Sequence, residues 1–228
     1  MPTAIVTGAS RGLGLALARS LADGGWRLVI DARDGVALEQ AAAVLRERAD
    51  VVALAGDVAD PWHRQALVAA AEGRLDLLVN NASTLGSAPL PPLARYPLDE
   101  LERVYRVNVL APLALMQLAL PLLAEGARIV NVTSDAAVEA YAGWGGYGSA
   151  KAALEQLSAV FAAEQPALRV YAVDPGDMNT HLHQEAFPGE DISDRPPPEQ
   201  SVPGLLALIE GELPSGRYAA AALARAPA

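Results

Sequence analysis

The sequence predicts one α/β domain, in which helices cover both faces of a doubly wound parallel sheet of about seven strands. Three observations predict this fold. Short apolar, β-branched runs alternate with Ala-, Leu- and Arg-rich stretches along the chain. The runs are apolar throughout, as is typical of parallel strands that are buried on both faces. No linker divides the 228 residues, a length that one large domain accommodates.

The elements follow from this alternation in chain order. Strands are expected near Thr3–Thr7, Arg27–Ala32, Val51–Ala55, Leu75–Val79, Arg128–Val132 and Arg169–Val173, with a last strand at Gly216–Ala222. Helices are expected near Leu13–Asp23, Val36–Arg48, Pro61–Glu72, Leu98–Leu123, Gly148–Ala163 and Pro198–Ile209. The proline-rich stretch Gly176–Pro198 fits neither pattern. An irregular segment of this length inside one domain is typical of a lid over an active site.

The bulk composition limits the classes of protein. Hydrophobic residues make up 52% and charged residues 19%, which indicates a compact globular chain. A net charge of −10 argues against nucleic acid and anionic membranes as partners. The absence of cysteine from the sequence excludes disulfides and thiolate chemistry, and it fits a reducing compartment.

Two further features bear on location. The N-terminus runs directly into a strand pattern, without the basic region or the cleavage site of a signal peptide. The longest apolar stretch, Val109–Ala124, is interrupted by two prolines and a glutamine and is shorter than the ~20 residues of a membrane span. We therefore expect a buried or interface helix there, and a cytoplasmic protein.

The first strand is followed by a glycine-rich turn, Thr7–Gly14, which reads TGASRGLG. Glycines allow the backbone to turn tightly and to approach a diphosphate, and the N–H groups at a helix start attract its negative charge. Placement between the first strand and the first helix favours a nucleotide over a purely structural turn. The candidate contacts are Gly8, Ser10, Arg11, Gly12, Leu13 and Gly14.

The end of the second strand bears on the choice between NAD and NADP. Asp31 stands one position too early for the acidic residue that holds a ribose 2′-hydroxyl, and strand alternation turns it away from the side of Ala32. Arg33, together with Arg11, could instead hold a 2′-phosphate. We expect NADP(H); an error of one residue in this register would make Asp31 a selector for NAD.

Tyr147 and Lys151 are one turn apart on a predicted helix, so they share a face. An ammonium group in that position favours the phenolate and lowers the tyrosine pKa. A phenol with a lowered pKa can exchange a proton near neutral pH, which hydride transfer to or from a carbon–oxygen bond requires.

The glycine turn, Ser134, Tyr147 and Lys151, in this order on an alternating α/β pattern, resemble the short-chain dehydrogenase/reductase family in its compact single-domain form, with a Rossmann-type sheet. The resemblance runs from Thr3 to about Thr180. It implies that Tyr147 is the general acid of a reduction, that Lys151 tunes it, that Ser134 holds the substrate oxygen, and that Asn108 belongs to a water-linked proton relay. It further implies cofactor contacts at Asp57, Val58, Asn81, Ala82, Tyr147, Lys151, Pro175, Gly176 and Thr180.

The sequence departs from the family pattern in two places. Ser83 stands where the family commonly has glycine after Asn-Asn-Ala. The chain also ends soon after Tyr218, without the longer tail that often helps to build tetramers. We therefore expect a homodimer, formed through the apolar helices Leu98–Leu123 and Gly148–Ala163, in preference to a tetramer.

Weaker signals concern the substrate. Tyr141 and Trp144 fall where the family builds its substrate wall, and an apolar or aromatic carbonyl compound would suit them; packing within the loop is the alternative. His181 is a further candidate contact. We expect no metal site, because His181 and His183 lie in the lid without a second set of ligands elsewhere. His63, after the helix start at Pro61, is expected at the surface.

The resulting prediction is an NADP(H)-dependent reductase of a ketone or an aldehyde. Two alternatives stay open at this stage. One is an NAD-dependent alcohol dehydrogenase that works in the opposite direction. The other is a nucleotide-binding regulatory protein without catalysis, although such a protein would not need the set of Asn108, Ser134, Tyr147 and Lys151.

Overall fold

The computed structural model describes residues 1–224 and contains the predicted seven-stranded sheet, with all neighbouring strands parallel in the order β3-β2-β1-β4-β5-β6-β7. The strands are β1 (Thr3–Val6), β2 (Arg27–Ala32), β3 (Val51–Ala55), β4 (Leu75–Asn80), β5 (Leu123–Val132), β6 (Arg169–Asp174) and β7 (Gly216–Ala219). The order reverses direction between β1 and β4, and a cleft at such a switch point is where doubly wound sheets bind ligands.

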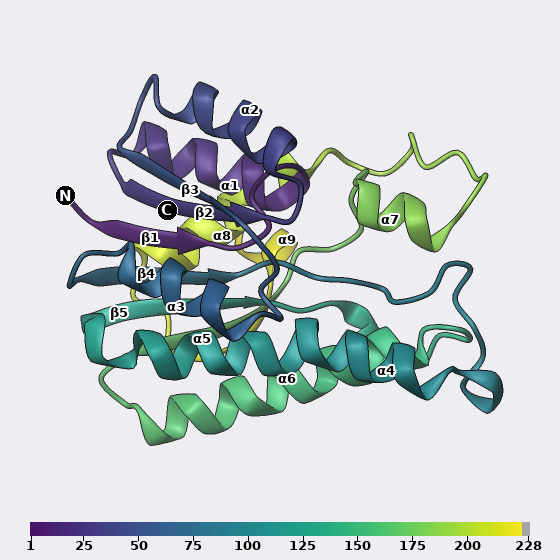
Figure 1. Cartoon of the computed structure of the whole chain (residues 1–228). Coiled ribbons are helices and arrows are strands. Elements are labelled where there is room, and N and C mark those ends of the chain that lie inside the picture. Colours follow the sequence, from purple (N-terminus) through teal and green to yellow (C-terminus); the bar gives the residue numbers. More distant parts are fainter. Residues whose placement is uncertain (225–228) are drawn as a thin grey trace.

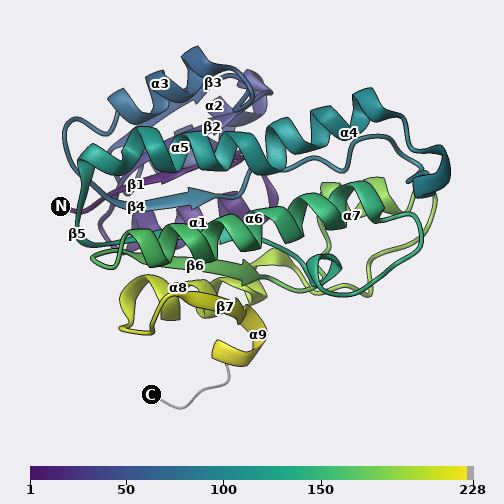
Figure 2. The ribbon, with the colours of Figure 1, turned by 90° about the horizontal axis from the view of Figure 1, so that it is seen from below.

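Helices cover both faces of the sheet (Figures 1 and 2). The first layer holds α1 (Gly12–Asp23), α2 (Gly35–Leu45) and α8 (Val202–Glu210). The second layer holds α3 (Pro61–Ala69), α4 (Leu98–Tyr105), α5 (Ala111–Ala119) and α6 (Gly145–Glu164). A short helix, α9 (Ala220–Leu223), follows β7, so the last predicted strand stops earlier than Ala222.

Strand alternation divides the core into two clusters. Ala4 and Val6 of β1 point into a cluster that includes Leu17 of α1 and Leu205 of α8. Ile5, between them, points into the opposite cluster with residues of α3 and α5. All three β1 side chains are fully buried. The continuous apolar runs of the sequence therefore have the predicted cause, since both faces of the sheet are covered.

The helix predicted over Leu98–Leu123 is divided into several parts. α4 passes into a π-helical stretch, Arg106–Leu110, before α5 begins, and the 3₁₀ turn Leu120–Leu122 leads into β5. A π-helical turn inside an α-helix frequently marks a functional position, and this one contains Asn108.

The continuous helical segment Leu98–Leu122 is long and apolar enough to cross a membrane, and 44% of its most apolar part is buried inside the protein. α5 packs on the sheet beside α3 in the second core cluster, which gives this apolar surface an interior role.

The predicted lid, residues 176–198, is not wholly irregular. It contains α7 (His181–Ala186), whose N-terminus is capped by the side chain of Thr180 accepting from the amide of His183. The amide of Asn179 donates to the carbonyl of Pro196 at 2.8 Å, so the two ends of the lid lie together. Figure 1 shows α7 and the following loop standing out from the carboxyl ends of the strands.

Candidate active site

A cavity of about 1100 Å³ lies at the carboxyl ends of the strands, between the glycine turn and the lid. Most of the residues that the sequence singled out line it: Gly8, Ser10, Arg11, Gly12, Leu13, Arg33, Asp57, Val58, Asn81, Ala82, Ser134, Tyr141, Trp144, Tyr147, Lys151, Pro175, Gly176, Thr180 and His181. The volume exceeds that of a site for one small molecule, and it suits a dinucleotide beside a small substrate.

The glycine turn has the geometry of a diphosphate site. Gly8 and Gly12 have φ values of 67° and 57°, which favour glycine. A Cβ on Gly14 would lie 2.5 Å from the carbonyl oxygen of Gly8, so Gly14 allows the turn and helix α1 to pack closely. Within residues 1–224, no side chain caps the start of α1 and no acidic residue stands in its first turn, which suits an anion at that end.

Thr7 and Asn81 connect the ends of β1 and β4 beneath this turn. Asn81 donates through Nδ2 to the carbonyl oxygens of Thr7 and Gly8, at 2.8 and 3.1 Å. The hydroxyl of Thr7 accepts from the amides of Asn81 and Ala82. The Asn-Asn-Ala segment therefore shapes the glycine turn, in addition to lining the cavity.

Asp31 is buried under the glycine turn, with both carboxylate oxygens engaged. Oδ1 accepts from the amide of Gly8 at 2.7 Å, and Oδ2 lies 3.0 Å from Nε2 of His63. His63 is 9% exposed, so the expectation of a surface position was wrong. Its ring packs against Gly56, where a Cβ would lie 2.2 Å from Nδ1. The partner of His63 lies 32 residues earlier in the chain, and the local helix-start signal does not reveal such a contact.

Arg33 and Arg11 flank the same end of the cavity. Arg33 is exposed and directly follows β2, next to the buried Asp31. Arg11 forms an exposed ion pair with Asp34 at 3.5 Å, and such a pair is weak in water. The carboxylate of Asp57 accepts from the amide of Ala59, which orders the turn after β3.

Tyr147 is placed by two glycines. Helix α6 begins at Gly145, three residues earlier than predicted, so Tyr147 is in its first turn and Lys151 in the next. A Cβ on Gly146 would lie 2.4 Å from the ring of Tyr96, and a Cβ on Gly148 would lie 2.4 Å from the carbonyl oxygen of Ala136. The absence of these two side chains allows the helix start to approach Tyr96 and the segment after Ser134.

The electrostatics of Tyr147 differ from the sequence prediction. Burial raises the pKa of Tyr147 above its ordinary value, and Asp174 and Asp135 act in the same direction, whereas the nearby hydroxyls of Ser83 and Ser134 oppose the rise. Burial also lowers the pKa of Lys151 to about 7. The prediction that an ammonium group lowers the tyrosine pKa is therefore wrong for this structure, because desolvation outweighs the short spacing.

Lys151 is 2% exposed. Its Nζ donates to the carbonyl oxygen of Val132 at 2.7 Å and lies 5.4 Å from the centroid of the Tyr147 ring. The lysine therefore ties α6 to the end of β5, two residues before Ser134. The phenol of Tyr147 and the hydroxyl of Ser134 both line the cavity near this contact.

The cavity thus combines a glycine-rich turn that suits a diphosphate with the side chains of Ser134, Tyr147 and Lys151. The short chain dehydrogenase family model matches residues 2–191. The chain belongs to this family. It is accordingly an oxidoreductase, and the predicted family, fold class and enzyme class are confirmed.

Individual relatives agree with this assignment. A rhamnolipid-biosynthesis 3-oxoacyl-[acyl-carrier-protein] reductase from Pseudomonas aeruginosa is 36% identical over 195 residues, which cover 78% of this chain and 73% of the relative. A short chain dehydrogenase from Pseudomonas syringae has a similar structure, with a TM-score of 0.90, 31% identity and coverage of 96% and 94% of the two chains. One from Shigella flexneri, complexed with NADP, has a TM-score of 0.87, 28% identity and coverage of 96% and 97%.

In this short chain dehydrogenase, the side chain of Asn108 lies behind the cavity wall and is fully buried. Its Nδ2 donates to the carbonyl oxygen of Thr84 at 2.8 Å. Its Oδ1 accepts from the amide of Thr84 and from the hydroxyl of Ser83, at 3.0 and 3.2 Å. Asn108 therefore braces the loop after β4. The hydroxyl of Ser83, the departure from the family pattern, is part of this brace.

The lid of this dehydrogenase closes onto the predicted substrate wall. The ring of Trp144 lies 5.7 Å from that of Tyr147 and 6.0 Å from that of Phe187, which follows α7. Gly176 has a φ of 77°, which turns the chain into the lid. A Cβ on Gly12 would lie 3.5 Å from the methyl group of Thr180, so the lid also reaches the glycine turn. The expected aromatic wall is therefore extended by a residue of the lid.

The lid histidines have different surroundings. His181 is 62% exposed on its side chain and pairs with Glu185 at 3.2 Å, at the cavity rim. His183 packs on the ring of Phe187 and lies 4.0 Å from Asp177. Throughout residues 1–224, no cluster of three or more His, Asp or Glu side chains is arranged to hold a metal ion.

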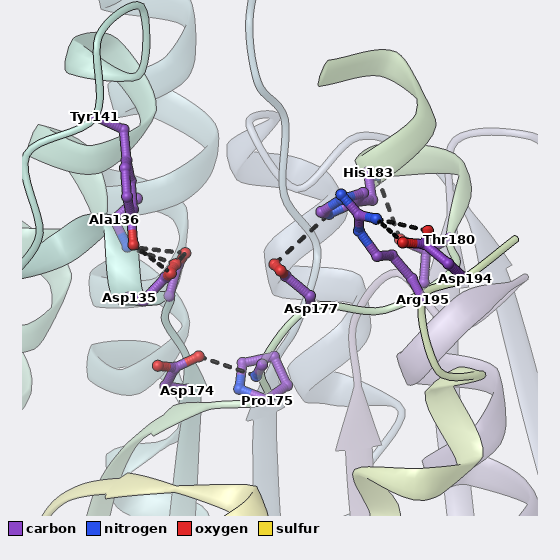
Figure 3. A network of polar contacts seen from close by, with 12 residues as sticks. Asp135, Ala136, Tyr141, Asp174, Pro175, Asp177, Thr180, His183, Asp194 and Arg195 are labelled. Carbon is purple, nitrogen blue, oxygen red and sulfur yellow. Dashed lines mark hydrogen bonds and ion pairs between the residues drawn. The ribbon is translucent and has the colours of Figure 1, made fainter. Parts of the chain in front are cut away.

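Sequence reasoning missed Asp135, which directly follows Ser134 and lines the cavity. Its Oδ1 accepts from the Ser134 hydroxyl at 2.9 Å and from the Ala136 amide at 2.7 Å, and its Oδ2 accepts from the Tyr141 hydroxyl at 3.0 Å. Figure 3 shows Asp135 below Tyr141 and Ala136, on the opposite side of Asp177 from His183. The one sequence feature that could have singled out Asp135 is its position directly after Ser134, which was predicted to be catalytic.

Proposed function

We propose that this protein is an NADP(H)-dependent reductase that converts a ketone or an aldehyde into an alcohol. The observation that carries the proposal is the buried Tyr147, which lies on the wall of the cavity together with Ser134 and Lys151. A protonated phenol in this position can give its proton to a carbonyl oxygen as hydride reaches the carbonyl carbon.

Each residue has a role that its position supports. The bound cofactor would supply the hydride that reaches the carbonyl carbon. Tyr147 gives its proton to the carbonyl oxygen, and Ser134 donates a hydrogen bond to the same oxygen as negative charge develops on it. Lys151 holds Tyr147 against the end of β5 and can return a proton to it, because its pKa is about 7. Asn108 holds the loop that carries Ser83 in place behind them.

The choice of NADP(H) rests on two arguments. The carboxylate of Asp31 is committed to Gly8 and His63, which leaves it poorly placed to select a ribose 2′-hydroxyl. Arg33 and Arg11 line that end of the cavity and suit the charge of a 2′-phosphate. The similar Shigella structure, which is complexed with NADP, supports the same choice.

The alternative of an NAD-dependent alcohol dehydrogenase is less well supported. Oxidation of an alcohol would use the same residues with Tyr147 as the base. The position of Arg33 and Arg11, which suits NADP(H), favours reduction over an NAD-dependent oxidation. The Pseudomonas aeruginosa relative is named as a reductase, which favours the same direction.

The proposal is tested by offering the purified protein a panel of ketones and aldehydes with NADPH, and following NADPH oxidation. Tyr147→Phe should lower turnover about 10²- to 10⁴-fold, because it removes the proton donor, and it should leave NADPH affinity nearly unchanged. Tyr105→Phe, in the apolar cluster between α4 and α6, is the matched control and should retain turnover. Failure of the whole panel to oxidise NADPH, or full activity in Tyr147→Phe, would refute the proposal.

We also propose that the protein forms a homodimer through the surface that α4, α5 and α6 share. These helices lie side by side (Figure 2). The surface carries apolar side chains that the monomer leaves exposed, among them Leu110 at 55% and Val160 at 43%. A second copy of the chain would remove them from water.

A further inference from the structure

The hydroxyl proton of Ser134 is already engaged in a hydrogen bond to the neighbouring Asp135. Ser134 donates to Oδ1 of Asp135 at 2.9 Å and accepts from the amide of Ala136 at 3.2 Å. A hydroxyl has one proton, so Ser134 must release Asp135 before it can donate to a substrate carbonyl oxygen. That release leaves Oδ1 of Asp135 with one donor fewer.

The carboxylate has further accepting capacity. Two carboxylate oxygens offer about four lone-pair sites. The structure fills three of them, with Ser134, Ala136 and the hydroxyl of Tyr141. When Ser134 turns to the substrate, two sites become available on a group that lines the cavity. An ionised acceptor that loses its donor in a partly buried site is costly unless the ligand replaces it.

From these contacts, and resting on the proposed reductase function, we infer that Asp135 selects substrates that carry an O–H or N–H donor on the carbon next to the carbonyl group. Such a substrate presents its carbonyl oxygen to Ser134 and Tyr147, and its neighbouring donor to Asp135. Two polar atoms on adjacent carbons are about as far apart as the partners of one hydrogen bond, which matches the spacing of Ser134 Oγ and Asp135 Oδ1.

The surroundings of Asp135 restrict the class further. Asp174 and Asp177 also line the cavity, so a carboxylate or a phosphate next to the carbonyl would meet like charges. Trp144 and Phe187 form the aromatic part of the wall and receive the remainder of the substrate. The class is therefore neutral or cationic α-hydroxy and α-amino carbonyl compounds with an apolar remainder.

The inference is tested with three ketones that differ in one group: acetophenone, 2-hydroxyacetophenone and 2-methoxyacetophenone. Their affinities are measured by calorimetry on the complex of the protein with the oxidised cofactor, which cannot reduce a ketone. The hydroxy ketone should bind at least about tenfold more tightly than acetophenone, as one hydrogen bond to a charged group implies. The methoxy ketone, which only accepts hydrogen bonds, should show no such gain.

Two variants assign the effect to Asp135. Asp135→Asn keeps the volume of the side chain but replaces one accepting oxygen by a donating amide group. It should reduce the affinity for 2-hydroxyacetophenone relative to acetophenone about tenfold. Glu139→Gln removes a carboxylate from the same loop at an exposed position outside the cavity lining, and it should leave the ratio unchanged. Equal binding of all three ketones, a gain with the methoxy group, or an equal loss in both variants would overturn the inference.

Turnover separates this inference from the proposed function. If the ketones are reduced with NADPH but without a preference for the hydroxy compound, the reductase function stands and the role of Asp135 fails. If the hydroxy ketone binds selectively but no NADPH is oxidised, the role of Asp135 stands and the reductase function fails. If none of the three ketones binds, the role of Asp135 fails, and the wider carbonyl panel with NADPH decides the reductase function.

Discussion

Lys151 holds its Nζ 5.4 Å from the centre of the Tyr147 ring, and in this buried position the lysine loses its proton more readily than the tyrosine does. The two residues are one helical turn apart, which by itself favours an ammonium–phenolate pair. Their burial disfavours both charges. The protein therefore keeps a neutral phenol beside a lysine that titrates near neutral pH.

The first prediction concerns the pKa of Lys151, which should be about 7. Lys151 is the only lysine in the sequence, so selective ¹³C-lysine labelling yields a single Cε signal to follow by NMR. A midpoint near the ordinary value of 10.5 would contradict the assignment of a desolvated amine.

The same pKa predicts a change of stability with pH. The folded protein releases the lysine proton near pH 7 and the unfolded chain near 10.5, so the unfolded chain binds more protons between these values. The contribution of Lys151 to the free energy of unfolding should therefore rise with pH across this window. Urea unfolding at pH 7 and pH 9.5 measures it, with Lys151→Met as the reference that lacks the titrating group.

Cofactor selection should depend on Arg33. Arg33→Ala removes a cation at the proposed 2′-phosphate end, and it should weaken NADPH binding about ten- to a hundredfold while NADH binding stays within about twofold. Arg48→Ala, which removes a surface arginine paired with Asp23, is the control and should change neither affinity. Equal losses for NADPH and NADH in Arg33→Ala would show that Arg33 does not read the 2′-phosphate.

Gly148→Ala should disturb the active site by displacing the start of α6. The added Cβ would lie 2.4 Å from the carbonyl oxygen of Ala136, so α6 must move away from the segment that carries Ser134. We expect a loss of about 1–3 kcal/mol in the free energy of unfolding, and lower turnover. Gly216→Ala places its Cβ no closer than 3.5 Å to a neighbouring atom and should stay within about 0.5 kcal/mol. Thermal unfolding and NADPH oxidation compare the two variants.

The proposed dimer predicts a particle of about twice 23.7 kDa in light scattering after gel filtration. Leu110→Arg introduces a charge into the shared surface of α4, α5 and α6 and should shift the protein toward the monomer. Val36→Arg replaces an exposed apolar residue on α2, in the opposite helix layer, and should leave the mass unchanged. A monomeric wild-type protein, or dissociation caused equally by both substitutions, would contradict this interface.

Local patterns in the sequence determined much of this protein. The alternation of apolar runs and helical stretches predicted all seven strands, and their parallel arrangement follows from it. The glycine turn and the spacing of Tyr147 and Lys151 are also local, because a strand–turn–helix junction and one helical turn each place their residues without help from the rest of the chain. Fold, family and most of the cavity wall could therefore be predicted.

Only the tertiary structure decided what depends on burial and on contacts between distant residues. His63 and Asp31 are 32 positions apart and meet under the glycine turn. Phe187 reaches Trp144 from the lid, which folds in part as a helix. The directions of the pKa shifts of Tyr147 and Lys151 come from desolvation, which depends on everything packed around them. The sequence therefore determined that the glycine turn, Ser134, Tyr147 and Lys151 share the site, and the packed chain decided which further residues join them and how the pKa values shift.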